Sequence, residues 1–252
     1  MHLFHRLIGT LLFLIIAIGL QAQSAIPKNV LFVGNSYTYF WNLPQTVGLL
    51  AKEKNIAMVT RQSTVGGATW GQHWRKDRGL KTIDLIEHGN FDAIVIQDFS
   101  RSAVDTPDSL LYYGQLLGDL IKQKGAQAYV YMSWAREWDP YMQKPITEKY
   151  TELAAKINAR IVPVGPAWQR ARELRPGFPL YDEDGSHPSP LGTYLTACVF
   201  YGVFTQQSPV GLPSRIVTTD KDGETLFLSV QSAETALFCQ KVAEEIIAQF
   251  KG

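Results

Sequence analysis

The segment Val30–Tyr39, with the sequence VLFVGNSYTY, predicts the first strand of an α/β fold. Its four consecutive apolar residues, Val30–Val33, are typical of a strand that is covered on both faces. The apolar run ends at Gly34-Asn35-Ser36, so a serine hydroxyl directly follows the strand. Because ligands of open α/β sheets bind beyond the carboxyl ends of the strands, Ser36 is a candidate reactive group.

Apolar runs of this kind alternate with amphipathic stretches along the rest of the chain. Strands are predicted at Asn29–Val33, Ala57–Arg61, Ala93–Gln97, Gln127–Ser133 and Ile161–Val164. Helices are predicted at Pro44–Lys54, Ile83–His88, Ser109–Lys124, Ile146–Ala159, Ala167–Leu174, Pro190–Phe204 and Val230–Phe250. Strands that alternate with helices through short connections form a parallel sheet with helices on both faces. The sequence therefore predicts an α/β fold of three layers, α/β/α, with about five parallel strands.

The first 22 residues differ from the rest of the 252-residue chain. A short basic start is followed by an apolar run over Ile8–Leu20 and by a small residue, Ala22. This run is shorter than the roughly 20 residues that a membrane span needs, so a cleaved signal peptide is predicted, with an uncleaved anchor as the alternative. Residues 23–252 are then expected to form one domain of an exported protein, either periplasmic or secreted.

The composition bounds the possible partners. A formal net charge of +1 gives no indication of nucleic-acid binding or of a polybasic membrane contact. Cys198 and Cys239 lie in apolar stretches, and both a disulfide and two buried thiols stay open. No metal site is predicted, because histidines are not clustered and Asp182-Glu183-Asp184 lacks the spaced oxygen ligands of a calcium loop. The oligomeric state is left open.

A candidate base for Ser36 lies in the late segment Asp184-Gly185-Ser186-His187-Pro188. Asp184 and His187 are three residues apart across a glycine, so the carboxylate can hold one imidazole nitrogen. The other nitrogen is then free to take the proton of a serine hydroxyl, which alone is a weak nucleophile near neutral pH. Loop and helix-capping roles are the alternative interpretation of Asp184 and Ser186.

Three short motifs resemble those of the SGNH (GDSL-like) hydrolase superfamily, in particular a poorly characterised exported bacterial branch. They are GNSYT at 34–38, VGGATW at 65–70 and DGSHPSPLG at 184–192. The resemblance implies a flavodoxin-like sheet, a catalytic triad of Ser36, His187 and Asp184, and hydrolysis of acyl esters without a metal or organic cofactor. Ser36 is not in the Gly-x-Ser-x-Gly elbow of α/β-hydrolases, since Thr38 replaces the last glycine.

The resemblance also implies an oxyanion hole, and here the sequence departs from the superfamily. Its members usually carry Gly-x-Asn-Asp after the third strand, where the asparagine donates to the oxyanion. This chain has Gln97-Asp98-Phe99-Ser100 at that place. We predict backbone donors at Ser36 and at Gly67, in preference to Gly66. The Gln97 amide is a third donor or, alternatively, merely ends the strand. Glycine suits the second position because the backbone must approach the reacting carbonyl closely.

Four further residues are predicted to contact the substrate: Asn35, His73, Trp134 and Arg136. A packing role is the alternative for His73, and loop packing is the alternative for the tryptophan and arginine after the fourth strand. Trp beside Arg suits stacking on a sugar ring or binding of a carboxylate. The sequence thus predicts an exported serine esterase that removes acetyl groups, with carbohydrate as the substrate by analogy. The alternatives are a catalytically silent carbohydrate-binding protein of the same fold, an esterase for longer acyl chains, and a structural envelope protein.

Overall fold

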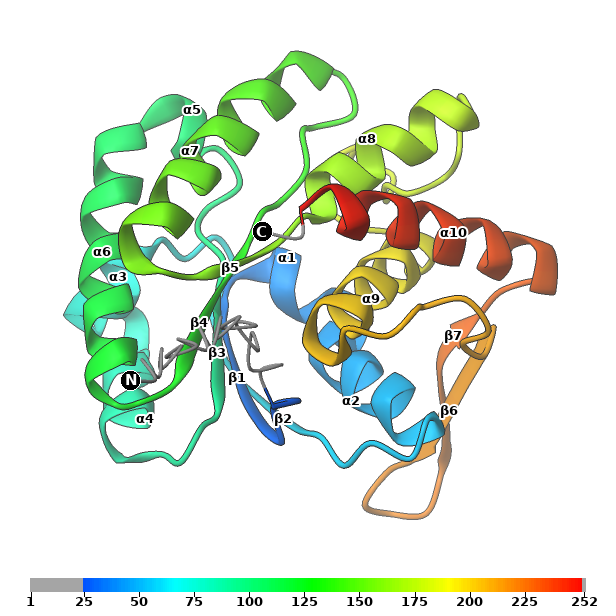
Figure 1. Cartoon of the computed structure of the whole chain (residues 1–252), viewed down its shortest axis with the longest axis horizontal. Coiled ribbons are helices and arrows are strands. Elements are labelled where there is room, and N and C mark those ends of the chain that lie inside the picture. Colours follow the sequence, from blue (N-terminus) through cyan, green and yellow to red (C-terminus); the bar gives the residue numbers. More distant parts are fainter. Residues whose placement is uncertain (1–24, 251–252) are drawn as a thin grey trace, which may run out of the picture.

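A computed structural model of the chain describes residues 25–250, so the predicted signal peptide lies outside the described residues. Its centre is a parallel sheet of five strands, β1 (Asn29–Gly34), β2 (Val59–Thr64), β3 (Ala93–Ile96), β4 (Gln127–Tyr131) and β5 (Arg160–Val162). The strands lie in the order β2-β1-β3-β4-β5 (Figure 1). This is the flavodoxin-like order, in which the chain reverses direction across the sheet between β1 and β3. The predicted fold class is confirmed.

Helices cover both faces of the sheet and complete the three layers (Figure 1). On one face lie α3 (Trp70–Arg75), α4 (Thr82–His88), α5 (Ser102–Asp105), α6 (Pro107–Gln123) and α7 (Gln143–Ile157). On the other face lie α2 (Leu43–Glu53), α8 (Val164–Leu174), α9 (Pro190–Thr205) and α10 (Ala233–Gln249). The short helix α1 (Ser36–Tyr39) directly follows β1.

The central strand β1 shows why its sequence is apolar without alternation. Val30 and Phe32 face the core on the side of α9, whereas Leu31 and Val33 face the core on the side of α6. All four side chains are fully buried. A strand that is covered on both faces needs apolar residues at every position, which is the pattern that identified it.

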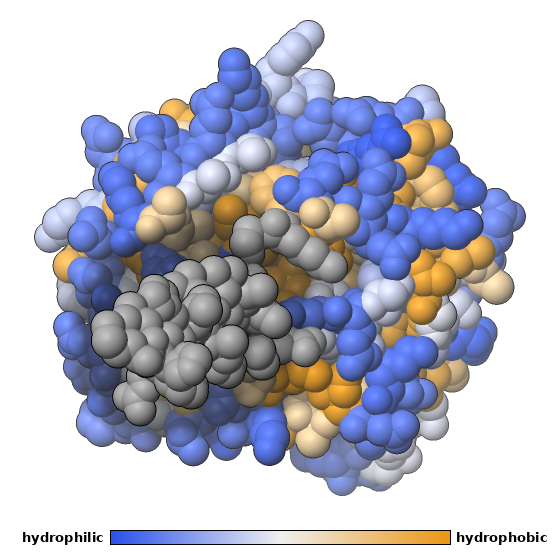
Figure 2. Space-filling model, in the orientation of Figure 1, coloured by the Kyte–Doolittle hydropathy of each residue, from blue (hydrophilic) through white to orange (hydrophobic). Residues whose placement is uncertain are grey.

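The structure differs from the predicted elements in several places, and the short helices α1, α3 and α5 were not predicted. An antiparallel hairpin of β6 (Arg215–Thr219) and β7 (Thr225–Val230) precedes α10 and was not predicted. The last helix therefore begins at Ala233, where Ser232 caps it by accepting a hydrogen bond from the Thr235 N–H. Figure 2 shows apolar residues on the side of the molecule where the hairpin and α10 lie, and the exposed apolar residues there include Val217, Phe227 and Leu237.

Both cysteines lie in this fold as buried, free thiols, so the packing alternative is the one observed. Burial raises the pKa of Cys239 to about 12, which keeps this thiol protonated and unreactive near neutral pH. Within residues 25–250, no helix combines the length and the apolar character that a membrane span requires.

Candidate active site

The turn after β1 places Ser36 at the carboxyl edge of the sheet. Gly34 is required there because a Cβ atom would lie 2.3 Å from the Thr38 Oγ1 and 2.7 Å from the Gln97 Oε1. Asn35 caps α1, since its Oδ1 accepts a hydrogen bond of 3.1 Å from the Tyr37 N–H. Ser36 is consequently the first residue of a helix that starts one residue after the strand.

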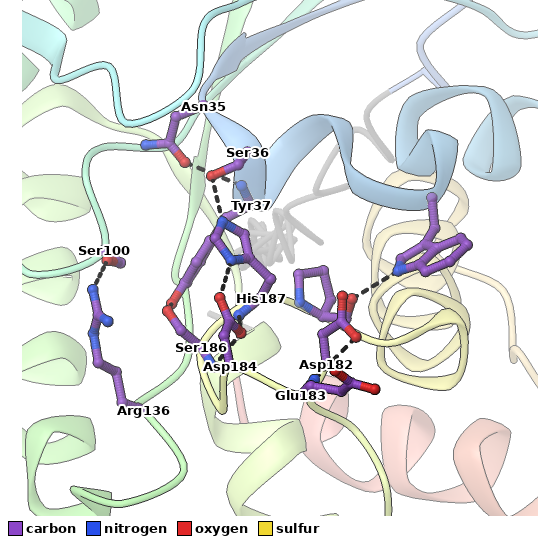
Figure 3. Close-up of polar contacts among 12 residues, drawn as sticks. Asn35, Ser36, Tyr37, Ser100, Arg136, Asp182, Glu183, Asp184, Ser186 and His187 are labelled. Carbon is purple, nitrogen blue, oxygen red and sulfur yellow. Dashed lines mark hydrogen bonds and ion pairs between the residues drawn. The ribbon is translucent and has the colours of Figure 1, made fainter.

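Three predicted residues form one hydrogen-bonded chain at this edge (Figure 3). The Nε2 of His187 lies 2.9 Å from the Oγ of Ser36, and its Nδ1 is hydrogen-bonded to the Oδ2 of Asp184. The Oδ1 of Asp184 accepts two backbone hydrogen bonds, of 2.9 Å from Ser186 and 2.8 Å from His187. Partial burial would raise the pKa of Asp184, but the hydrogen bonds from His187 and Ser186 outweigh it and leave this pKa below its ordinary value.

The loop that carries Asp184 and His187 is fixed by aromatic side chains from other elements. The Tyr37 hydroxyl lies 2.7 Å from the Ser186 Oγ, and the Trp134 Nε1 donates a 3.0 Å hydrogen bond to the Ser186 carbonyl. Phe40 stacks on the imidazole of His187, with ring centres 4.4 Å apart and planes inclined by 15°. These contacts restrict the imidazole to the orientation in which it meets both of its partners.

A cleft of about 450 Å³ opens beside Ser36. Its walls come from the carboxyl ends of four strands, since Ser36 follows β1, Gly67 follows β2, Ser100 follows β3 and Arg136 follows β4. Asp184 and His187 complete the wall from the loop between α8 and α9. The position of the cleft is therefore the one that the topology of the sheet predicts.

Two backbone N–H groups are available at the cleft. No acceptor among residues 25–250 takes a hydrogen bond from the N–H of Ser36 or of Gly67. Gly67 has a φ of +68°, in the left-handed region that favours glycine. Both residues line the cleft, and their role as donors to an oxyanion stays a prediction.

Gln97 does not have the predicted role, and this is a correction. Its side chain is fully buried, and its Oε1 accepts hydrogen bonds from the Asn35 N–H at 3.1 Å and the Thr38 Oγ1 at 2.9 Å. Its Nε2 donates to the carbonyl of Asp98, and the buried side chain does not line the cleft, so it offers no donor to a substrate there. Gln97 instead supports the turn after β1 from behind.

Asn35 lines the cleft, but its amide is likewise occupied. Its Nδ2 donates to the carbonyls of Ala68 at 3.0 Å and Asp98 at 3.2 Å. Together with its capping bond, these contacts join the loops after β1, β2 and β3. Asn35 thus connects the three loops that form this part of the cleft. Its side-chain amide is engaged in those hydrogen bonds, so we do not assign it a polar contact with a substrate.

His73 is also not at the cleft, which corrects the second predicted contact. It is fully buried on α3, where its Nε2 donates a 3.0 Å hydrogen bond to the Gly34 carbonyl and its Nδ1 lies 2.6 Å from the Thr82 Oγ1. Burial lowers the pKa of His73 to about 4. The packing interpretation is the one that holds.

Trp134 and Arg136, predicted as a pair, differ in position. Trp134 is buried between Tyr37 and Trp168, with ring centres 4.5 and 3.9 Å away, so its predicted contact with the substrate is wrong. Arg136 lines the cleft, and its Nη2 donates a 3.1 Å hydrogen bond to the Ser100 Oγ (Figure 3).

Ser100 and Phe40 are cleft residues that were not predicted. Ser100 was missed because Gln97 is the first polar residue after β3, whereas the residues of this loop that line the cleft are Phe99 and Ser100. Phe40 carries no chemical signal of its own. Among residues 25–250, no group of three or more histidine, cysteine or acidic side chains can hold a metal ion.

No protein-family model and no curated protein matches the chain, but solved structures do. A DUF4886 family protein from Bacteroides uniformis is 17% identical, with a TM-score of 0.72 over 87% of this chain and 94% of that one. A protein from Slackia heliotrinireducens assigned to the SGNH hydrolases is 24% identical, with a TM-score of 0.62 over 69% and 97%. A mutant of an acetyl-xylooligosaccharide esterase from Geobacillus is 17% identical, with a TM-score of 0.55 over 70% and 94%.

At sequence identities this low, the structural similarity shows a shared fold and nothing further. The sheet order, the position of the cleft and these structural neighbours agree with one another. The chain has the fold of the SGNH hydrolases, and the resemblance seen in the sequence motifs is confirmed at the level of the fold.

Proposed function

We propose that this protein is a serine esterase in which Ser36 is the nucleophile, His187 the general base and Asp184 the residue that orients the base. The observation that carries the proposal is the continuous hydrogen-bonded chain from Asp184 through His187 to Ser36 at the edge of a cleft. The ester-hydrolysing structural neighbours support the same reaction class.

The first half of the reaction forms an acyl-enzyme. The Ser36 Oγ attacks the ester carbonyl while its proton passes to the Nε2 of His187, and the resulting imidazolium is stabilised by the Asp184 carboxylate. His187 then gives that proton to the departing alcohol as the C–O bond breaks. In the second half, His187 takes a proton from water, the hydroxide attacks the acyl carbonyl, and Ser36 leaves as it regains the proton.

Negative charge develops on the carbonyl oxygen in both halves, and the backbone N–H groups of Ser36 and Gly67 would bind it. Removing one donor from such a hole costs about 3–4 kcal/mol of transition-state stabilisation. With Gln97 turned away, these two donors carry that role without the asparagine that is usual in the superfamily.

We also propose that the acyl group is acetyl and that the alcohol is a carbohydrate. Two neighbours of the same fold are an acetyl-xylooligosaccharide esterase and an acetyl xylan esterase. In this chain Trp138 is 62% exposed and its ring lies against Gly185 of the loop that carries His187. An exposed tryptophan beside a reacting centre is suited to stacking on a sugar ring.

The proposal is tested by hydrolysis of p-nitrophenyl acetate by the chain from residue 23, beside its Ser36→Ala variant. We expect turnover that disappears with Ser36→Ala, falls with longer acyl chains and is accompanied by acetate release from acetylated oligosaccharides. Equal rates for the two proteins would contradict a serine nucleophile. Binding of oligosaccharides without any hydrolysis would instead support the silent carbohydrate-binding alternative.

Export is a separate proposal that rests on the pattern of residues 1–22. Sequencing the amino terminus of protein recovered from the periplasm or medium of an expressing bacterium is expected to begin at Gln23. A full-length chain in the membrane fraction would show that residues 1–22 stay attached as an anchor.

A further inference from the structure

Among residues 25–250, the cleft contains one arginine without a charged partner. Four other arginines, Arg75, Arg101, Arg170 and Arg175, lie within 4 Å of a carboxylate. Within residues 25–250 the guanidinium of Arg136 has no such ion pair, and its Nε is buried without any hydrogen-bond partner. Its one hydrogen bond goes from Nη2 to the neutral Ser100 Oγ.

This arrangement leaves most of the hydrogen-bond donors of the Arg136 guanidinium without an acceptor in the described part of the chain. A guanidinium carries five N–H donors in a fixed fork that matches the two oxygens of a carboxylate. A buried donor of a charged group that stays unpaired is costly, and buried donors in folded proteins are nearly always paired. The acidic residue that lines the cleft, Asp184, is already bound to His187 and to backbone N–H groups.

The arginine is also joined to the reacting centre. The Trp138 ring lies 5.4 Å from the Arg136 guanidinium and packs so closely on Gly185 that a Cβ there would be 2.8 Å from the ring. The Glu137 N–H donates a 2.9 Å hydrogen bond to the Gly185 carbonyl. The cation, the exposed aromatic ring and the loop that carries His187 are therefore in contact with one another.

We infer that the substrate is an anionic ester, an acyl ester of a sugar acid, whose carboxylate binds Arg136 while its ring lies near Trp138. The inference rests on the proposed esterase function and narrows its substrate class. The proposed acetyl group has no ionisable group, so the carboxylate must belong to the alcohol part of the ester. If Arg136 served only to hold Ser100 in place, its loss would affect charged and neutral esters alike.

The test compares matched pairs of esters. 4-Acetoxybenzoate and its methyl ester differ in a charge on the alcohol part, and mono-p-nitrophenyl succinate and its methyl ester differ in a charge on the acyl part. Because methylation also changes the leaving group, each ratio is compared between wild type and variants. We expect the wild-type protein to prefer 4-acetoxybenzoate over its methyl ester by roughly 10- to 100-fold in kcat/KM, the range for hydrogen bonds to charged groups. The preference is expected to weaken as salt is added.

Variants then assign the preference to Arg136. In Arg136→Gln the ratio of the two kcat/KM values is expected to fall close to one, whatever the absolute rates. Arg136→Lys, which keeps the charge but not the fork, is expected to give an intermediate ratio. Arg101→Gln removes the same charge from a neighbouring arginine already paired with Asp105, so it should leave the ratio unchanged.

The outcomes separate this inference from the esterase proposal. An active enzyme with no preference for the charged ester, or one whose preference survives Arg136→Gln, overturns the inference and leaves the esterase intact. A preference confined to the succinate pair overturns the assignment to a sugar acid. If no ester is hydrolysed, calorimetric binding of 4-acetoxybenzoate and of its methyl ester to the Ser36→Ala protein, with and without Arg136→Gln, still decides whether the carboxylate is bound.

Discussion

Two histidines meet the same end of β1 and have opposite properties. His73 approaches from α3 and binds the Gly34 carbonyl, whereas His187 approaches from the loop before α9 and binds the Ser36 hydroxyl. The Nε2 of His73 must carry a hydrogen in order to donate to a carbonyl. The Nε2 of His187 accepts, because its Nδ1 hydrogen is committed to Asp184.

The partner of Nδ1 decides whether each imidazole can accept a proton at Nε2. His73 has only the Thr82 hydroxyl, is fully buried and has no nearby carboxylate, so a positive charge on it is strongly disfavoured. His187 has the Asp184 carboxylate and a face open to the cleft, so it can take a proton during a reaction. One histidine supports the turn, and the other acts on the residue that the turn presents.

The largest expected effect comes from removing the second histidine. His187→Gln should lower kcat for p-nitrophenyl acetate by roughly four orders of magnitude or more, as loss of a triad base does in other serine hydrolases. Its urea midpoint should change little, because the side chain is partly exposed. A variant that keeps most of its activity would show that His187 is not the base.

Asp184→Asn changes the partner instead of the base and is expected to lower kcat by roughly 10²- to 10⁴-fold. The asparagine no longer stabilises the imidazolium, but the loop keeps its backbone contacts. Steady-state kinetics at pH 7 measure the effect. A loss equal to that of His187→Gln would mean that the two residues are inseparable, and no loss would exclude Asp184 from the reaction.

His73→Gln is expected to change stability and leave the kinetics of the folded protein nearly unaltered. Leaving buried partners unsatisfied costs about 1–3 kcal/mol of the free energy of unfolding at pH 7. Since the pKa of His73 is about 4 in the fold and 6.5 when unfolded, the unfolded state takes up a proton first as the pH falls. Wild-type stability from this residue is therefore full above pH 6.5 and decreases by about 3 kcal/mol on acidification to pH 4.

Urea unfolding at pH 7 and pH 4 checks this prediction. The stability advantage of wild type over His73→Gln should fall by about that amount between pH 7 and pH 4, so that it disappears or reverses in acid. A difference that is independent of pH would mean that the pKa of His73 is the same in the folded and the unfolded protein.

The stability contributed by Asp98, a buried acid beside the helix α3 that carries His73, is expected to depend on pH in the opposite direction. Burial raises the pKa of Asp98 from 3.8 to about 6, even though its Oδ1 accepts hydrogen bonds from the N–H groups of Trp70 and Phe99. Its contribution to stability is full below pH 3.8 and decreases by up to about 3 kcal/mol as the pH rises through 6. Asp98→Asn keeps the acceptor oxygen, so this variant should gain stability over wild type between pH 4 and pH 8, measured by urea unfolding. A constant difference would contradict the raised pKa.

The smallest effect is expected from the ring that stacks on His187. Phe40→Leu removes an aromatic pair of the kind that contributes about 0.5–1.5 kcal/mol, so kcat should fall by roughly 2- to 10-fold. Tyr112→Leu, which changes a 61% exposed ring away from the cleft, is a suitable control. Equal rates for Phe40→Leu and wild type would show that Asp184 alone orients the imidazole.

The comparison of the two histidines also shows what the sequence can predict. Five parallel strands and the Asp184–His187 pair follow from local patterns, because a doubly covered strand needs a continuous apolar run and a three-residue spacing brings two side chains together. His73 and Gln97 were misplaced because their orientation is set by Gly34, Thr38 and Thr82, which come from other parts of the chain. The β6–β7 hairpin lies between two predicted helices, in a segment for which no element was predicted.

The cleft wall formed by Ser100 and Arg136 is the least predictable part of the site. The two residues are 36 positions apart, and only the neighbouring positions of β3 and β4 bring them together. The lack of an ion pair at Arg136 is a property of its surroundings, so no motif in the sequence encodes it.

The central claim is that Ser36 is a nucleophile activated by His187. Treating the protein with diethyl p-nitrophenyl phosphate, which phosphorylates activated serines and releases p-nitrophenol, tests it directly. We expect stoichiometric release of p-nitrophenol, a matching mass increase on the peptide that contains Ser36, and neither in His187→Gln, while His73→Gln reacts like wild type. Labelling at another residue, or an unlabelled Ser36 in a protein that hydrolyses esters, would contradict the claim.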